Sequence, residues 1–253
     1  GLWRVEGSWE RQAYAGLAHA GTDSAADPTV TREERRRTAL TFADWIASNL
    51  RLEVGAALDK WSGRGAHLAF EGTLEARVAG DRLTLSAQAA QWTSLANGAP
   101  FQAGGLTARW STRNIERGGW LARAGVSRAT SEAPLALWPG AGTGSGRAPL
   151  LRAHPLLDEG VMTGRAFGRT LVHSGIERQS WAWTFKSLRL GWILFVDGAR
   201  PWDTSRLERV PWQTDGGGGI RLAGLGTRGE FRIAAARGFE DGHTAISVLW
   251  EGR

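Results

Sequence analysis

The sequence predicts an all-β fold, an antiparallel transmembrane β-barrel with about twelve strands in this chain. Three observations lead to this prediction: long stretches in which apolar and polar residues alternate, connections whose lengths alternate between long and short, and tryptophans near the ends of the stretches. Because the composition does not change along the 253 residues, we expect a single barrel domain over residues 1–253.

The clearest alternation runs from Ala66 to Val78. Leu68, Phe70 and Leu74 fall on one face of this stretch, whereas His67 and Glu71 fall on the other. A Gly-Asp turn follows, and the alternation resumes. Strands of soluble domains usually have about 5–6 residues, and a strand tilted across a bilayer needs about 9–11. We therefore expect the Leu68 face to contact lipid and the His67 face to line a charged lumen.

Eleven further stretches complete the predicted barrel. With the first they lie at residues 2–17, 36–46, 50–61, 66–79, 82–93, 101–113, 118–130, 168–183, 188–199, 215–223, 226–237 and 243–251. Odd connections are mostly long and even ones short, as in barrels with tight periplasmic turns and longer extracellular loops. The longest connection, 131–167, is expected to enter and obstruct the lumen. The charged run Arg32–Arg37 is expected to lie in a solvated loop.

Tryptophan and arginine dominate the composition. Eight of the fourteen tryptophans lie near predicted strand ends and are expected to form aromatic girdles: Trp3, Trp45, Trp61, Trp92, Trp181, Trp183, Trp202 and Trp250. The alternative is an ordinary core, or a carbohydrate platform, in a soluble Trp-rich β-sandwich. Arginines are spread one or two per strand opposite glutamates, which predicts a lumen of mixed charge and argues against nucleic-acid binding.

The sequence predicts neither catalysis nor a cofactor. Cysteine is absent, and His19, His67, His154, His173 and His243 stand outside the motifs of metallohydrolases and serine hydrolases. No carboxylate spacing predicts a metal site. We expect a non-enzymatic protein; a lipid hydrolase that uses His67 or His173 is the less favoured alternative.

Residues 150–253 carry two local motifs and a closing strand. A loop contains Leu151-Arg152-Ala153-His154-Pro155, a later strand contains Phe195-Val196-Asp197-Gly198, and the last stretch ends at Trp250. In these features the chain resembles the outer-membrane assembly-factor superfamily, the bacterial surface antigen family of BamA and TamA type. In that family a loop arginine meets the aspartate of a Phe-x-Asp-x-Gly strand motif inside the barrel.

The resemblance implies that Arg152 pairs with Asp197 beside Phe195. Ala153 and His154 depart from the Gly and Phe/Tyr of the loop motif, and Ala199 stands where the strand motif has glycine. A rival register for the loop motif uses Arg165 and Phe167. The alternation independently points Asp197 into the barrel, where an unpaired carboxylate is costly and an arginine is its best partner. Hydration, or pairing with another arginine of the wall, is the alternative.

The resemblance also implies a location and a role. The location is the bacterial outer membrane, and the role is insertion or export of proteins at a weakly paired seam between the first and last strands. It implies a C-terminal assembly signal at Ile246, Val248 and Trp250. The implied partners are the lipid bilayer, lipopolysaccharide, and client outer-membrane or secreted proteins. Family barrels have sixteen strands behind periplasmic domains, so we expect the C-terminal part of a longer protein or a shortened relative. The alternative role is a passive barrel, either a pore or the anchor of a detached domain.

Overall fold

In the computed structural model of the protein, the strands of the described residues all belong to one sheet, with the order β14-β13-β12-β11-β10-β7-β6-β5-β4-β3-β2-β1-β9-β8. The structure describes residues 1–14, 30–112, 118–142, 150–162, 166–202, 210–224 and 229–252. Two of the fourteen strands, β8 (Leu157–Asp158) and β9 (Val161–Met162), have two residues each. The other twelve are β1 (Leu2–Tyr14), β2 (Thr31–Ala47), β3 (Leu50–Trp61), β4 (Gly65–Val78), β5 (Leu83–Ser94), β6 (Phe101–Ser111), β7 (Gly118–Ala129), β10 (Thr170–Phe185), β11 (Leu188–Trp202), β12 (Gln213–Gly224), β13 (Gly229–Gly238) and β14 (Thr244–Gly252).

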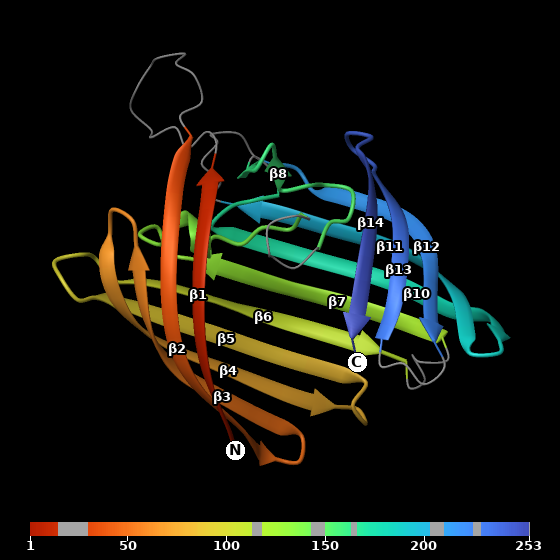
Figure 1. Cartoon of the computed structure of the whole chain (residues 1–253), viewed down its shortest axis with the longest axis horizontal. Helices are drawn as coiled ribbons and strands as arrows, with labels where there is room; N and C mark the ends of the chain where they lie inside the picture. The colour runs from red at the N-terminus through yellow and green to blue at the C-terminus, as the bar shows by residue number, and fades with distance from the viewer. Residues whose placement is uncertain are drawn as a thin grey trace.

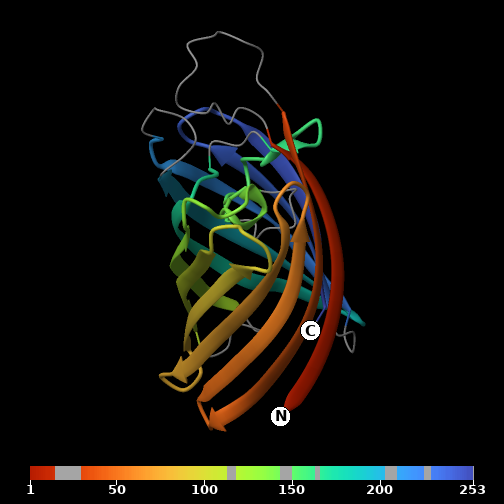
Figure 2. The ribbon, with the colours of Figure 1, turned by 90° about the vertical axis from the view of Figure 1, so that its left-hand side faces the viewer.

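The long strands form an antiparallel meander, in which each pairs with the next one along the chain. The pairing of β7 with β10 spans the long connection, and β1 also forms a short parallel ladder with β9. The sheet curves until β1 and β14 lie on the same side of the molecule (Figures 1 and 2). Within the described strands, β14 pairs with β13 alone. A soluble sandwich would need two stacked sheets, which this single sheet does not provide.

The twelve predicted strands correspond to the twelve long strands, with one substantial error. The charged run Arg32–Arg37 was expected in a loop, but it lies in β2, which begins at Thr31. Arg35 and Arg37 both contact Asp59 of the neighbouring strand β3. The sequence predicted this strand over residues 36–46 but not its first residues, because the inward positions there hold arginines instead of small polar residues.

The two faces of the sheet differ as predicted. Leu58, Phe70 and Leu194 are exposed on the convex face, whereas Asp59, Ala69 and Phe195, their neighbours in sequence, are buried on the concave face. Concave charges largely pair with one another, as in Arg51–Glu53 and Arg77–Glu75.

The prediction of aromatic girdles was wrong for four tryptophans. Trp45 stands opposite Arg51 of the concave face, and the guanidinium carbon of Arg77 lies 4.5 Å from its ring centroid. Trp61 and Trp92 are buried on the concave face, and the guanidinium carbon of Arg221 lies 4.0 Å from the ring centroid of Trp181. Trp61 shares the face of Asp59, two residues earlier, so the period of the strand turns it inwards. Trp3, Trp183, Trp202 and Trp250 are exposed, as expected for a girdle.

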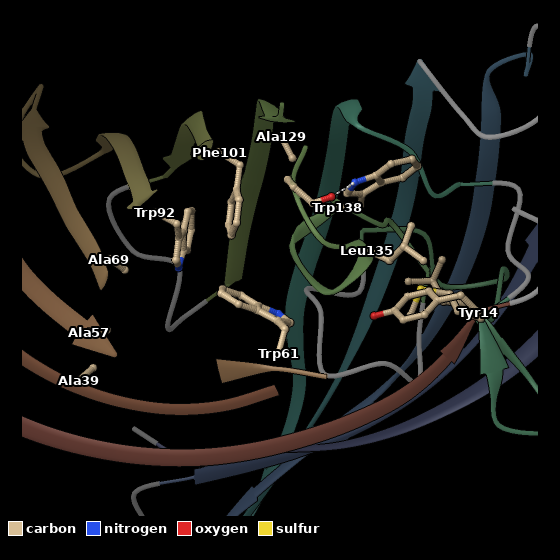
Figure 3. Close-up of a cluster of buried hydrophobic side chains, with 13 residues drawn as sticks. Tyr14, Ala39, Ala57, Trp61, Ala69, Trp92, Phe101, Ala129, Leu135 and Trp138 are labelled. Carbon is tan, nitrogen blue, oxygen red and sulfur yellow. Dashed lines mark hydrogen bonds between the residues drawn. The ribbon is translucent and has the colours of Figure 1, made fainter. Parts of the chain in front are cut away.

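The long connection between β7 and β10 lies inside the curve of the sheet, towards the end opposite the N-terminus (Figure 2). Its Trp138 stacks on Phe167, which in turn stacks on Tyr14 of β1, each pair with ring centroids 5.8 Å apart. Trp61, Trp92 and Phe101 pack edge to face or stacked nearby (Figure 3). In the described part of the chain the one helical segment is η2 (Leu135–Leu137), and no helix is long and apolar enough to cross a membrane.

Candidate functional site

A buried carboxylate on β11 forms the centre of the site. Asp197 is 1% exposed, and its Oδ1 lies 3.0 Å from Nη2 of Arg123 on β7. Gly175 of β10 stands between them in the sheet, opposite both residues. A Cβ at this position would come within 2.5 Å of Asp197 Oδ1 and 3.1 Å of Arg123 Nε. The glycine therefore leaves room for an ion pair that crosses three strands.

The long connection supplies the second arginine of the site. Nε of Arg152 lies 3.1 Å from Oδ2 of Asp197, and its Nη2 lies 2.6 Å from Oε2 of Glu177 on β10. The guanidinium carbon lies 3.8 Å from the ring centroid of Phe195. One loop side chain thus contacts two carboxylates and an aromatic ring of the wall, which suits the planar fork of arginine and not the single ammonium of lysine.

A chain of polar contacts extends from Glu177 across the concave face. Arg232 of β13 lies 3.3 Å from Glu177 and also pairs with Glu230. Glu230 pairs with Arg221 of β12, whose Nη1 donates a 2.8 Å hydrogen bond to Gln179 Oε1. Buried charges are costly unless they are paired, and these contacts provide the partners. The contacts join the wall strands β10, β12 and β13 into one network beside the loop.

His154 forms a second attachment of the same loop. Its Nδ1 lies 2.6 Å from Oδ1 of Asp215 on β12, and its Nε2 lies 3.0 Å from Oδ2 of Asp241 in the β13–β14 connection. The backbone N–H of Ala153 donates a 2.5 Å hydrogen bond to Asp215 Oδ2. The Asp215 contact raises the pKa of His154 above its ordinary value against the opposing effect of burial, and Asp241 adds to the rise. The imidazolium is the form that both carboxylates favour.

The structure brings Arg152, Asp197 and Phe195 together. Of the rival register, Arg165 lies outside the described residues, and Phe167 packs in the aromatic cluster with Tyr14 and Trp138. Ile246, Val248 and Trp250 are exposed along β14 on one face of the strand.

Neither His67 nor His173 takes part in the ion pairs of this site, although His173 stands two residues before Gly175 on the same face of β10. The ring of His67 packs against Trp61 and Phe101, and His173 is buried on β10. His19 lies outside the described residues. Among the described residues, no three or more His, Asp or Glu side chains lie close enough together to hold a metal ion.

Sequence reasoning did not identify Glu177 or Asp215 as partners of the loop, and it did not single out Arg123 among the arginines of the predicted lumen. A signal for their direction was present. Glu177 shares a strand face with the buried Gln179, and Asp215 shares one with the buried Arg221. The alternation does not show which loop residue contacts Glu177 or Asp215, because these contacts join residues far apart in the sequence.

An antiparallel sheet with an apolar convex face, a charged concave face and a loop fixed inside its curve has the fold of a transmembrane β-barrel. No protein-family model and no curated protein matches the sequence. Among solved structures, the chain is similar to the crystal structure of BamA from Haemophilus ducreyi lacking POTRA domains 1–3, with 12% identity and a TM-score of 0.57. The match covers 98% of this chain and 59% of that chain. The predicted BamA-type barrel fold is thereby confirmed.

Proposed function

We propose that this chain is a non-enzymatic barrel of the bacterial outer membrane that assists the insertion or export of other proteins. The observation that carries the proposal is the contact of Arg152 with Asp197 and Glu177, which fixes a long loop inside a sheet of BamA-type fold. The loop is attached by buried, charge-assisted contacts, so its position is defined rather than averaged over the lumen.

The two ends of the sheet supply the mechanism. Along the described strands, β14 pairs with β13 alone, and β1 pairs beyond β2 only at the two residues that meet β9. Unpaired backbone groups in lipid are expensive, and an exposed strand edge pairs readily with another strand. A client strand that adds to either edge would gain a backbone ladder, the usual mode of strand addition. Ile246, Val248 and Trp250 would then face the lipid beside the client.

A reconstituted assembly reaction tests this proposal. The purified chain in phospholipid vesicles is mixed with a urea-unfolded outer-membrane barrel, and the folded client is followed by its heat-modifiable gel migration. We expect faster client folding than in vesicles that hold an unrelated barrel. Arg152→Gln should remove most of this acceleration, and Arg4→Gln, which alters the half-exposed Arg4–Glu6 pair, should keep it. Equal client folding in both kinds of vesicle contradicts the proposal.

One observation favours the second candidate, a passive barrel. A cavity of about 290 Å³ lies on the concave face, where polar side chains such as Glu53, Glu71 and Gln88 share its lining with apolar ones such as Trp92. Polar groups of this kind would line the water-filled path of a pore. Single-channel recording separates the two candidates. A steady conductance that is the same in wild type and Arg152→Gln supports a passive pore, whereas absent or intermittent current does not.

A further inference from the structure

The convex face carries basic residues close to the strand ends on the side of the sheet that bears the long connections. We call these six residues the cationic rim: Arg11, Arg36, Lys60, Arg128, Arg200 and Arg237. Five of them stand within three residues of the end of β1, β3, β7, β11 or β13, and Arg36 stands near the start of β2. Each falls on the convex face by alternation, as Lys60 does two residues after the exposed Leu58.

The other ends of the same strands are mainly apolar on this face. The first convex side chains there are Trp3 of β1, Leu50 of β3, Trp120 of β7, Leu188 of β11 and Phe231 of β13. The exception is β2, where Ala47 stands opposite Leu50 and the acidic Asp44 follows opposite Leu52. A lipid-facing wall needs apolar residues throughout the hydrocarbon, and aromatic residues are favoured at its borders. Basic residues of the convex face are therefore more frequent at this border of the apolar band than at the other.

Arg36 and Lys60 are the most closely placed members of the rim. They stand directly opposite each other on β2 and β3, with Trp9 of β1 on the far side of Arg36. Like charges in directly opposite positions destabilise a sheet unless an anion offsets them. Glu34 lies 2.9 Å from Arg36, and in the described residues Lys60 has no carboxylate within ion-pair distance. The pair therefore retains net positive charge at an exposed site.

We propose that the cationic rim binds the phosphates of a phosphorylated glycolipid in the outer leaflet, with Arg36 and Lys60 as its main site. The inference rests on the outer-membrane location proposed above, which places the long connections outside. Neighbouring strands lie about 4.8 Å apart, so a headgroup with two phosphates can engage cations of more than one strand. A phospholipid with a single phosphate can contact fewer of these cations. Lysine and arginine are the side chains that bind phosphate most strongly.

Lipid binding by the purified chain tests this inference. The delipidated protein in detergent micelles is titrated with bisphosphorylated lipid A, with the same lipid after removal of its phosphates, and with phosphatidylglycerol, and bound lipid is measured by native mass spectrometry. Because each basic residue near a membrane surface contributes about fivefold to anionic lipid binding, the double variant Arg36→Gln/Lys60→Gln should bind lipid A roughly 30-fold more weakly. The dephosphorylated lipid should bind to the wild-type chain as weakly as lipid A binds to the double variant.

A matched control removes one convex arginine from outside the rim. Arg178 of β10 lies with its guanidinium carbon 5.5 Å from the ring centroid of Trp120, near the apolar end of β7. Arg178→Gln should leave lipid A binding unchanged. The charge-preserving exchange Arg36→Lys/Lys60→Arg should retain binding, and heat-modifiable migration checks that each variant is folded.

Three results would overturn the inference: equal lipid A binding by the double variant and wild type, equal binding of the dephosphorylated lipid, or phosphatidylglycerol binding as tightly as lipid A. Because the assay contains no client protein, its failure is distinguishable from failure of the assembly proposal.

Discussion

Removal of the loop arginine from the wall should lower the stability of the folded chain. In Arg152→Gln, Asp197 and Glu177 each lose a cationic partner, and Phe195 loses the guanidinium above its ring. Breaking a buried ion pair usually costs about 3–5 kcal/mol because a charge is left without a partner. Here Arg123 remains 3.0 Å from Asp197, and Arg232 remains 3.3 Å from Glu177. We therefore expect a loss of about 2–3 kcal/mol.

Guanidinium titration of the folded chain in micelles, followed by tryptophan fluorescence, measures this loss. Arg152→Lys should fall between wild type and Arg152→Gln, because an ammonium cannot present the planar fork that reaches both carboxylates. Arg4→Gln is the matched control. The Arg4–Glu6 pair has both side chains about half exposed, and such pairs contribute about 0–1 kcal/mol.

A double-mutant cycle separates the contact from general damage. The loss of unfolding free energy caused by Arg152→Gln is measured in wild type and again in the Asp197→Asn variant. If Arg152 and Asp197 interact, the loss in the Asp197→Asn variant should be smaller by at least about 1 kcal/mol. A loss no greater than that of Arg4→Gln, or strictly additive losses in the cycle, would refute the assigned contact.

Two further predictions concern the strand and the histidine beside this contact. Gly217→Ala should lower the free energy of unfolding by about 1–3 kcal/mol, because the new Cβ would overlap the carbonyl oxygen of Ala235. In the control Gly72→Ala the nearest atom to the new Cβ is 3.7 Å away, so the loss should be small. Equal denaturation midpoints of the two variants would contradict this. The pKa of His154 is higher in the folded chain than in the unfolded chain, where it is about 6.5. The charged His154 therefore stabilises the folded chain fully below about pH 6.5, and this stabilisation is lost as the pH rises through the folded pKa. Limited proteolysis of the loop should accelerate between pH 6 and pH 9 in wild type, and His154→Asn should be cleaved quickly at both values.

Alternation predicted most of the fold because it is a local signal. Long strands, their two faces and the inward direction of Asp197 all follow from a period of two, which any stretch of a dozen residues displays. The signal failed at β2, where Arg35 and Arg37 occupy concave positions and their charge resembles that of a loop. Asp59 of β3 and Glu71 of β4, both more than twenty residues away in the sequence, explain why arginines are stable there.

The partners in the site were less predictable than the strands. The motif resemblance led to Arg152 and Asp197, but Arg123 is 74 residues away from Asp197 in sequence and meets it through the alignment of three strands. His154 departs from the aromatic residue of the family motif, and sequence alone gave no reason for the change. The structure supplies one, since an imidazole reaches Asp215 and Asp241 together and a phenyl ring does not.

The loop connects the first strands to the later ones by contacts of different chemistry. On the β1 side they are aromatic, through Phe167 and Tyr14, and hydrogen-bonded, through the β9 ladder and the Glu33 carboxylate of β2, which accepts from two backbone N–H groups of the loop. On the other side they are ion pairs: Arg152 contacts carboxylates of β10 and β11, and His154 contacts Asp215 of β12 and Asp241 of the β13–β14 connection. Salt screens the exposed part of ionic contacts and leaves aromatic packing intact, and a pH above the pKa of His154 removes one of its charges. The loop should therefore release the last strands before the first, so that the distance between β1 and β14 depends on the ionic attachment. A spin-label pair on these two strands should show a broader distance distribution in Arg152→Gln than in wild type, and an unchanged distribution would mean that the sheet holds its curvature without the loop.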